Sequence, residues 1–170
     1  MYLRKRLSFK QKFQIQKTQL ERKIVNMKTT NQKDFEKNNI FGLGAPNVNF
    51  AKYFIGNSYL NPLTDMNKTS LFLANVTFEP TCRNNWHIHE ATKNGGQILI
   101  CIAGEGWYQE EGKKAINLKP GMVITIPANI KHWHGAKRDS WFSHIAIEVP
   151  GENTFTKWCE PVTDEEYNEL

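Results

Sequence analysis

The chain has 170 residues, 39% hydrophobic and 12% aromatic, enough to bury the core of one ordinary domain, which excludes disorder throughout. The net charge of +5 is uneven, because residues 1–26 hold eight basic residues and one acidic residue whereas residues 27–170 hold fourteen basic and sixteen acidic residues. The larger part carries −2, so we expect no nucleic-acid binding by the folded domain. No run of eighteen apolar residues occurs, so no membrane-spanning helix is expected.

Residues 1–40 are interpreted as a basic N-terminal extension, disordered or helical. Its positive charge could bind nucleic acid or anionic lipid, but a charge run without a motif is more typical of a solvated tail. It lacks the apolar stretch and cleavage site of a secretory signal. Met27 offers a second start, which would leave residues 1–26 out of the mature protein.

Three cysteines without C-x-x-C spacing favour a reduced, cytoplasmic setting.

Short β-rich runs recur roughly every ten residues from Phe50 onward, separated by turns rich in glycine, proline and asparagine. This spacing predicts a single all-β sandwich or barrel over residues 41–170, followed by a short C-terminal helix. Thr163 would cap that helix and form a capping box with Glu166. Residues 28–49 contain no strong pattern. The predicted strands are 71–78, 85–89, 97–103, 106–110, 114–118, 122–126, 132–136 and 143–149.

His87 and His89 stand two residues apart in a predicted strand, so both imidazoles project from the same face. Gln97 begins the next apolar run and His132 follows a later one, so each would add one more side chain from a neighbouring strand. Such buried polar groups are unfavourable unless something satisfies them all, and a metal ion would do so. The alternative is that the histidine pair consists of ordinary, partly exposed strand residues.

With these histidines, the segment 121–132 resembles the second of two motifs of the cupin superfamily, G-x5-P-x-G-x-x-H; the first is H-x-H with a carboxylate. By this resemblance His87, His89 and His132 take the histidine positions and Gln97 takes the carboxylate position. Asn129 replaces a glycine, and asparagine tolerates the left-handed region. The resemblance covers about residues 71–149 and implies a small jelly-roll barrel, also called a double-stranded β-helix.

Longer strings are similar to a group of small single-domain cupins. This group includes bacterial manganese-dependent hydroxynitrile lyases and the cupin modules of carboxymuconolactone-decarboxylase-like proteins, and in it the glutamine is a metal ligand. The resemblance therefore supports Gln97 as a ligand and places Ala74 and Val76 at the wall of the substrate pocket. The strings that carry it are Val76-Thr77-Phe78-Glu79-Pro80, Trp86-His87-x-His89, Gly96-Gln97, Lys131-His132-Trp133-His134-Gly135, His144-x-Ala146-Ile147 and Val162-Thr163-Asp164-Glu165.

Four neutral ligands would leave the charge of a divalent ion uncompensated, which favours Lewis acidity and attracts anions. Imidazole and amide ligands suit several transition metals. The resemblance favours Mn, and Fe, Zn, Ni and Co remain open. No cysteine lies at a ligand position, which argues against a closed structural zinc site.

The predicted strand 143–149 places His144 and Glu148 on one face. We expect His144 to act as the general base and Glu148 to orient it or raise its basicity. His134 shares strand parity with His132, and we expect it at the rim of the pocket or hydrogen-bonded behind the ligands.

The resemblance implies a metal-dependent lyase that cleaves or forms a carbon–carbon bond beside the oxygen of a small substrate. One alternative is an Fe- or Mn-dependent dioxygenase; another is a non-catalytic cupin that binds a small molecule. Ile98, Ile100 and Ile102 form an apolar outer face that the N-terminal residues or a second subunit must cover. We therefore predict a homodimer or larger oligomer.

Overall fold

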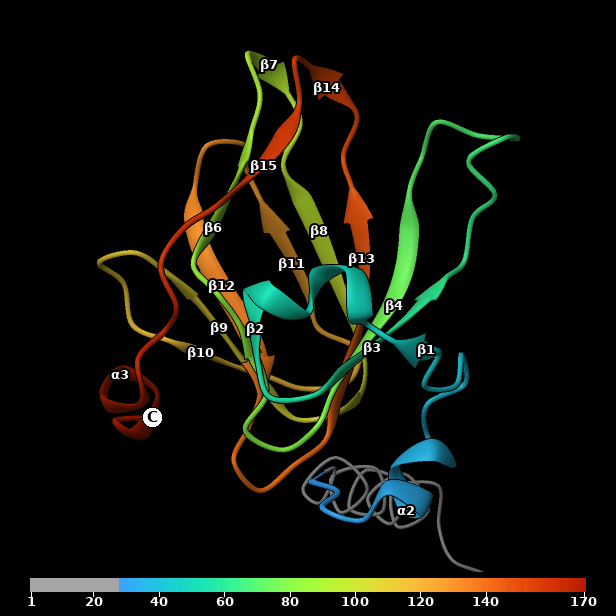
Figure 1. The fold of residues 1–170 in the computed structure, drawn as a ribbon, viewed down its shortest axis with the longest axis vertical. Helices are drawn as coiled ribbons and strands as arrows, with labels where there is room; N and C mark the ends of the chain where they lie inside the picture. Colours follow the sequence, from blue (N-terminus) through green and yellow to red (C-terminus); the bar gives the residue numbers. More distant parts are fainter. Residues whose placement is uncertain (1–27) are drawn as a thin grey trace, which may run out of the picture.

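The computed structural model describes residues 28–170, whose framework is two facing sheets of antiparallel strands (Figure 1). The first sheet has the order β1 (Ala45–Pro46), β3 (Ser58–Pro62), β4 (Leu73–Phe78), β13 (Phe142–Glu148), β8 (Gln97–Gly104) and β11 (Val123–Ile126). The second has the order β10 (Ile116–Leu118), β9 (Gly106–Glu110), β12 (Lys131–Ala136), β5 (Arg83–Asn84) and β2 (Phe54–Ile55). In the same sheet β6 (His87–Glu90) pairs with β12 and with β15 (Phe155–Trp158).

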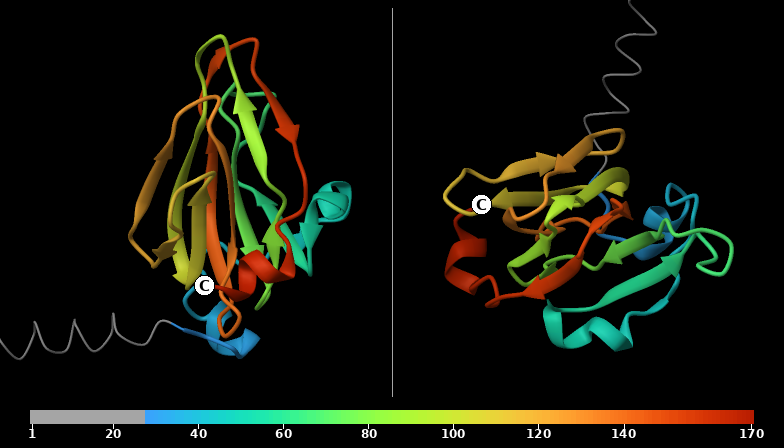
Figure 2. Two further views of the ribbon diagram at one scale, coloured as in Figure 1. Left: turned by 90° about the vertical axis from the view of Figure 1, so that its left-hand side faces the viewer. Right: turned by 90° about the horizontal axis from the view of Figure 1, so that it is seen from above.

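Three short helices and one ribbon complete the described part. They are α2 (Gln32–Glu36), the 3-10 helix η1 (Val48–Tyr53), α3 (Asp164–Asn168), and the pair β7 (Lys93–Asn94) and β14 (Gly151–Glu152). The ribbon lies at the end of the barrel opposite α2 and α3 (Figure 2). Among residues 28–170, no helix combines the length and the apolar character needed to cross a bilayer.

The predicted all-β architecture is confirmed, and each predicted strand corresponds to a strand within a few residues. The strand predicted at 85–89 begins at His87, because Asn85 and Trp86 donate their backbone N–H groups to Tyr53 and Glu160 instead. The strands β2, β3 and β15 were not expected. They are short and show no sustained alternation of apolar and polar residues, so their pairing depends on the neighbours they meet.

Side-chain alternation divides the barrel wall into an inner and an outer face. Along β8 the residues alternate between buried and half-buried, with Gln97, Leu99 and Cys101 inside and the three isoleucines outside. The inward apolar side chains form one core cluster, which stabilises the fold by about 1.5–3 kcal/mol for each large side chain. Its members are Val76, Phe78, Cys82, Leu99, Cys101, Tyr108, Leu118, Ile126, Ala136, Phe142 and Ala146.

The N-terminal residues that the structure describes pack on the barrel. Phe35 in α2 is fully buried and stacks on Trp141 with ring centroids 5.5 Å apart. Trp141 also donates its backbone N–H to the carbonyl of Thr29 at 2.8 Å. Residues 1–27 lie outside the described residues, so the predicted boundary at residue 40 and the character of the extension stay predictions.

The predicted C-terminal capping box is confirmed. Thr163 Oγ1 accepts from the backbone N–H of Glu166 at 3.2 Å, and Glu166 Oε2 accepts from the backbone N–H of Thr163 at 2.8 Å. Tyr167 then donates its hydroxyl to the carbonyl of Ala136 at 2.8 Å, which holds α3 against the end of β12.

Candidate metal centre and its cavity

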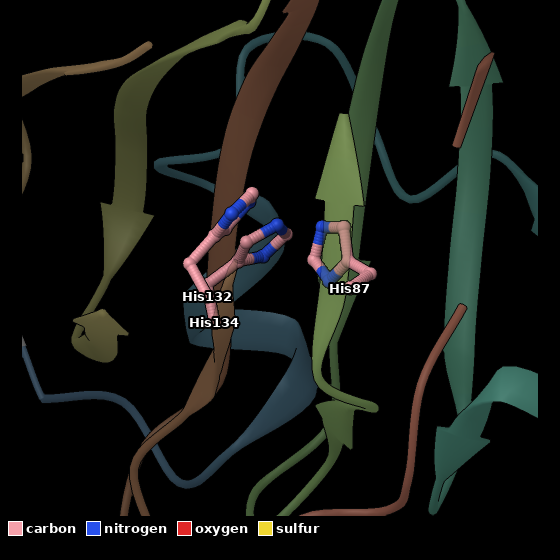
Figure 3. A group of neighbouring side chains, drawn as sticks. All are labelled: His87, His132 and His134. Atoms are coloured by element: carbon pink, nitrogen blue, oxygen red, sulfur yellow. The ribbon is translucent and has the colours of Figure 1, made fainter. Parts of the chain in front are cut away.

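All five histidines of the chain are buried, and their rings form one connected group inside the barrel. His87 on β6 pairs in register with His132 on β12, and their ring centroids are 4.2 Å apart. Figure 3 shows His87 facing His132 and His134 from the opposite strand. These three offer ring nitrogens that all lie within 4.8 Å of one another, close enough to hold a metal ion.

Two local backbone features bring the strands of the site together. Asn129 has φ +67°, as its place in the motif predicted, and its side chain bonds both the N–H and the carbonyl of Ala91 just beyond β6. Gly96 has φ +94°, and a Cβ there would lie 2.3 Å from the carbonyl oxygen of Ile126. Only glycine allows this approach, which places Gln97 at the start of β8.

His87 and His132 are oriented by their own strands. Nδ1 of His87 lies 2.9 Å from the carbonyl oxygen of Asn85, and Nδ1 of His132 lies 2.9 Å from that of Ile130. A carbonyl only accepts, so each Nδ1 carries the proton and each Nε2 keeps a lone pair. This is the arrangement that metal-ligating histidines usually show.

His89 and Gln97 both contact the carboxylate of Glu148. Nδ1 of His89 lies 3.0 Å from Oε2 of Glu148, and Nε2 of Gln97 donates to Oε1 at 2.8 Å. Burial acts to raise the pKa of Glu148, but the hydrogen bonds from His89 and Gln97 and the electrostatic attraction of His89 and His132 outweigh it and hold that pKa below its ordinary value.

The four predicted ligands, His87, His89, Gln97 and His132, are called the ligand set below. Within residues 28–170, His89 Nε2, Gln97 Oε1 and His132 Nε2 are buried without any hydrogen-bond partner. An unsatisfied buried polar atom costs about 1–3 kcal/mol, so three of them among the predicted ligands need an explanation. A divalent cation accepts lone pairs from imidazole nitrogen and amide oxygen alike, and these residues therefore fit one.

His134 and His144, called the histidine pair below, have a different environment. His144 Nε2 lies 3.1 Å from His134 Nδ1. Asn84 accepts the backbone N–H of His134 at 2.9 Å, and its Nδ2 lies 3.3 and 3.1 Å from the two ring nitrogens of His134. Both ring nitrogens of His134 thus have protein partners, which distinguishes it from the ligand set although it lies close to His87 and His132.

Burial sets the charge of these imidazoles. Desolvation lowers the pKa of His132 to about 4 and that of His144 to about 3. Burial, followed by repulsion from neighbouring histidines, lowers the pKa of His87 and His134 well below the ordinary value. All four are neutral at neutral pH, which is the form that binds metals or accepts protons.

A cavity of about 420 Å³ opens beside the ligand set. His87, His89 and Gln97 line it together with His134, whereas His132 lies behind them, fully buried. The other residues that line it are Asn47, Phe50, Phe54, Leu60, Phe72, Val76, Asn84, Glu90, Gly96, Ala146, Glu148, Val149, Thr154, Phe155, Thr156 and Trp158.

Three residues expected at this cavity lie differently from what their strand positions suggested. Val76 lines it as expected, but Ala74 does not, because its short side chain is fully covered by neighbours. His144 does not line it either, since His134 stands between it and the cavity. Glu148 contacts His89 and Gln97 rather than orienting His144.

The apolar wall of the cavity was missed by sequence reasoning. Phe50 on η1 and Phe155 on β15 lie at its rim, 43% and 58% exposed, and Trp158 packs on His87 with ring centroids 4.9 Å apart. The sequences of η1 and β15 show little hydrophobic periodicity. Only their aromatic residues could have indicated that they line a cavity. Asn84 was missed as well, because nothing local indicates that it meets a histidine fifty residues away.

Comparisons with known proteins identify the family and the fold. Residues 74–145 match the family model described as a cupin domain. (R)-mandelonitrile lyase from Granulicella tundricola is 39% identical over 118 residues, which cover 69% of this chain and 87% of that protein. A cupin-like protein of known structure from Thermotoga maritima is 38% identical with a TM-score of 0.68, over 76% of this chain and 95% of the other. A cupin 2 conserved barrel domain protein from Rhodopseudomonas palustris shares the fold alone, at 13% identity and a TM-score of 0.53 over 69% and 74% of the two chains.

Proposed function

Because the chain belongs to the cupin superfamily, we propose that it is a metal-dependent lyase acting on a small, uncharged, hydroxylated substrate with an apolar body. The reaction cleaves or forms the carbon–carbon bond next to the hydroxyl-bearing carbon. An aromatic cyanohydrin has these features, and the relative from Granulicella tundricola is named for one of them. We propose Mn as the metal, with Fe, Zn, Ni and Co as the other candidates.

The unsatisfied atoms of the ligand set are the observation that carries this proposal. They point to one cation, and they lie beside a cavity with room for a small molecule. When bound, a divalent ion held by neutral ligands supplies a Lewis acid for an oxygen of the substrate.

The wall of the cavity favours an apolar, uncharged substrate. Phe50, Phe54, Phe72, Phe155 and Trp158 supply aromatic surface to it. No lysine or arginine lines the cavity within the described residues, whereas Glu90 and Glu148 do. An anionic substrate would therefore meet two carboxylates and no basic side chain, which offsets the attraction for anions expected from the neutral ligands.

We assign the proton transfer to the histidine pair. His134 lines the cavity outside the ligand set, and its Nδ1 faces His144. Its Nε2 lies 3.1 Å from Asn84 Nδ2, so the substrate hydroxyl would replace Asn84 as the partner of that nitrogen. In cyanohydrin cleavage the hydroxyl proton moves to His134, the bonding electrons leave with cyanide, and the same proton completes hydrogen cyanide. His144 contacts the ring of His134, and Asn84 accepts the backbone N–H of His134, so both help to hold this residue in place.

The test uses the full chain, purified without chelator or nickel resin, supplied with Mn²⁺ and mixed with (R)-mandelonitrile. We expect benzaldehyde release that chelator abolishes and Mn²⁺ restores. The variant His134→Ala should lose about 10²–10⁴-fold in kcat, the usual contribution of a general base, while its metal content stays unchanged. Loss of metal in this variant would instead make His134 a ligand.

Two other results would reject the lyase. Oxygen consumption with Fe²⁺ and no cyanohydrin cleavage would identify a dioxygenase. Binding of the cyanohydrin without turnover in the metal-loaded protein would identify a binding module.

We further propose a homodimer or larger oligomer. Ile102 packs with the cluster of Phe35 and Trp141, so the N-terminal segment covers part of the outer face of β8. Val123 on the adjacent edge strand β11 remains 57% exposed and pairs in register with Ile100, which supports a contact with a second subunit there. A single monomeric species in sedimentation across a wide concentration range would contradict this.

A further inference from the structure

Glu148 joins two members of the ligand set that come from different strands. It is opposite Gln97 in the register of β13 and β8. Its Oε1 accepts from Gln97 Nε2 at 2.8 Å, and its Oε2 lies 3.0 Å from His89 Nδ1. The atoms of these two residues that lack a hydrogen-bond partner within residues 28–170 are Gln97 Oε1 and His89 Nε2.

The chemistry of a carboxylate explains why those particular atoms are left over. An ionised carboxylate has acceptors and no donor, so Gln97 must turn its NH₂ group toward Glu148 and its oxygen away. For the same reason His89 must carry its proton on Nδ1, which leaves the lone pair on Nε2. Thr156 Oγ1 also lies 3.3 Å from His89 Nδ1, but a hydroxyl both donates and accepts and selects neither tautomer.

We propose that Glu148 is the positioning residue that selects the ligating atoms of His89 and Gln97. Through them it presents one imidazole lone pair and one amide oxygen to the metal, and it places a negative charge beside four neutral ligands. The inference rests on the proposed function in that it requires a metal at the ligand set. The effect of Glu148 on the orientation of Gln97 and on the tautomer of His89 exists in the metal-free protein as well.

A glutamine at position 148 is the sharpest test, because it keeps the size of the side chain and has one acceptor and one donor. It can satisfy Gln97 or His89 as Glu148 does, but not both. When its NH₂ group faces His89, the proton of His89 moves to Nε2, and that nitrogen can no longer bind a metal. Aspartate keeps the acceptor-only chemistry and serves as the conservative variant.

The first measurement is the tautomer of His89 in the metal-free full chain, from two-bond ¹H–¹⁵N spectra of ¹⁵N-histidine-labelled protein. We expect the Nδ1–H form in the wild type and a shift toward Nε2–H in Glu148→Gln, with Glu148→Asp closer to the wild type. His89→Gln identifies the resonance. An unchanged tautomer in Glu148→Gln would overturn the inference.

The second measurement is Mn²⁺ affinity by competition with a chelator. Glu148→Gln should bind about 10- to 100-fold more weakly, as is usual when a partner of a ligand is lost. Glu90→Gln is the matched control, since Glu90 also lines the cavity but its carboxylate faces Lys157 at 3.8 Å. Its affinity should stay near that of the wild type.

Equal losses in the two variants would mean that charge alone matters and would overturn the positioning role. If the wild type bound no metal at all, the proposed function would fail, and the tautomer spectra would still decide whether Glu148 selects the atoms of His89.

Discussion

Two groups of buried polar side chains share the barrel interior, and they differ in how their polar atoms are used. In the ligand set, one atom of each residue bonds to the protein while His89, Gln97 and His132 each leave another atom without a partner among residues 28–170. In the histidine pair, both ring nitrogens of His134 have partners. His144 Nδ1 also has no partner in the described part of the chain, but the ring of His144 contacts Phe78 and Phe142 and does not line the cavity. Burial of a histidine therefore does not by itself mark a metal ligand. A buried polar atom that lacks a hydrogen-bond partner and belongs to a residue lining the site is the better indicator.

The largest effect is expected from removing two ligands at once. His87→Ala/His132→Ala deletes facing imidazoles of β6 and β12, and elemental analysis should find the metal content falling from about one ion per chain to nearly none. The wild type, purified in parallel without chelator or affinity-column nickel, is the control. Equal metal content in both proteins would place the ion elsewhere and end the distinction between the two groups.

Acid should destabilise the metal-free protein through both groups. The pKa of His132 is about 4 in the folded protein against 6.5 ordinarily, so between these values the unfolded chain binds more protons and stability falls as the pH is lowered. His132 alone would account for about 3 kcal/mol across this window. Urea unfolding at a series of pH values measures the decline, and it should be shallower in His87→Ala/His132→Ala. A profile that is flat from pH 7 to pH 4 would contradict the neutral, buried state of these rings.

The smallest effect concerns the one ligand that is not a histidine. Gln97→Ala removes an amide oxygen and frees one oxygen of Glu148, and it should weaken metal retention about 10-fold or more. Chelator competition measures this, with far-ultraviolet circular dichroism to confirm the fold. Unchanged affinity would remove Gln97 from the ligand set and shift the metal toward His87, His132 and His134.

Local chemistry explains which features were predictable. Period-two alternation placed His87 and His89 on one inner face, and the burial pattern of β6 confirms it. The motif predicted the positive φ of Asn129, and the Thr163 capping box needs only residues three apart. Strand parity also placed His144 and Glu148 on the inner side of β13.

Alternation along a strand predicts which face of the sheet a side chain occupies. It does not predict which residue of another strand that side chain contacts, and the expected contacts of Glu148 and His144 depended on this. Glu148 was expected to contact His144, which lies on the same face of the same strand. The register of β13 against β8 instead brings Glu148 to Gln97, 51 residues earlier in the chain. His144 was expected to reach the substrate, but the position of His134 on a facing strand keeps it behind the wall.

The sequence by itself determined the all-β barrel, the inward faces and the residue types that could bind a metal, because these depend on neighbours a few residues apart. Only the tertiary structure decided how those residues are partnered. Inter-strand register and the packing of η1 and β15 over the cavity bring together groups that are distant in the chain, and those contacts decide which atoms are left free for a metal.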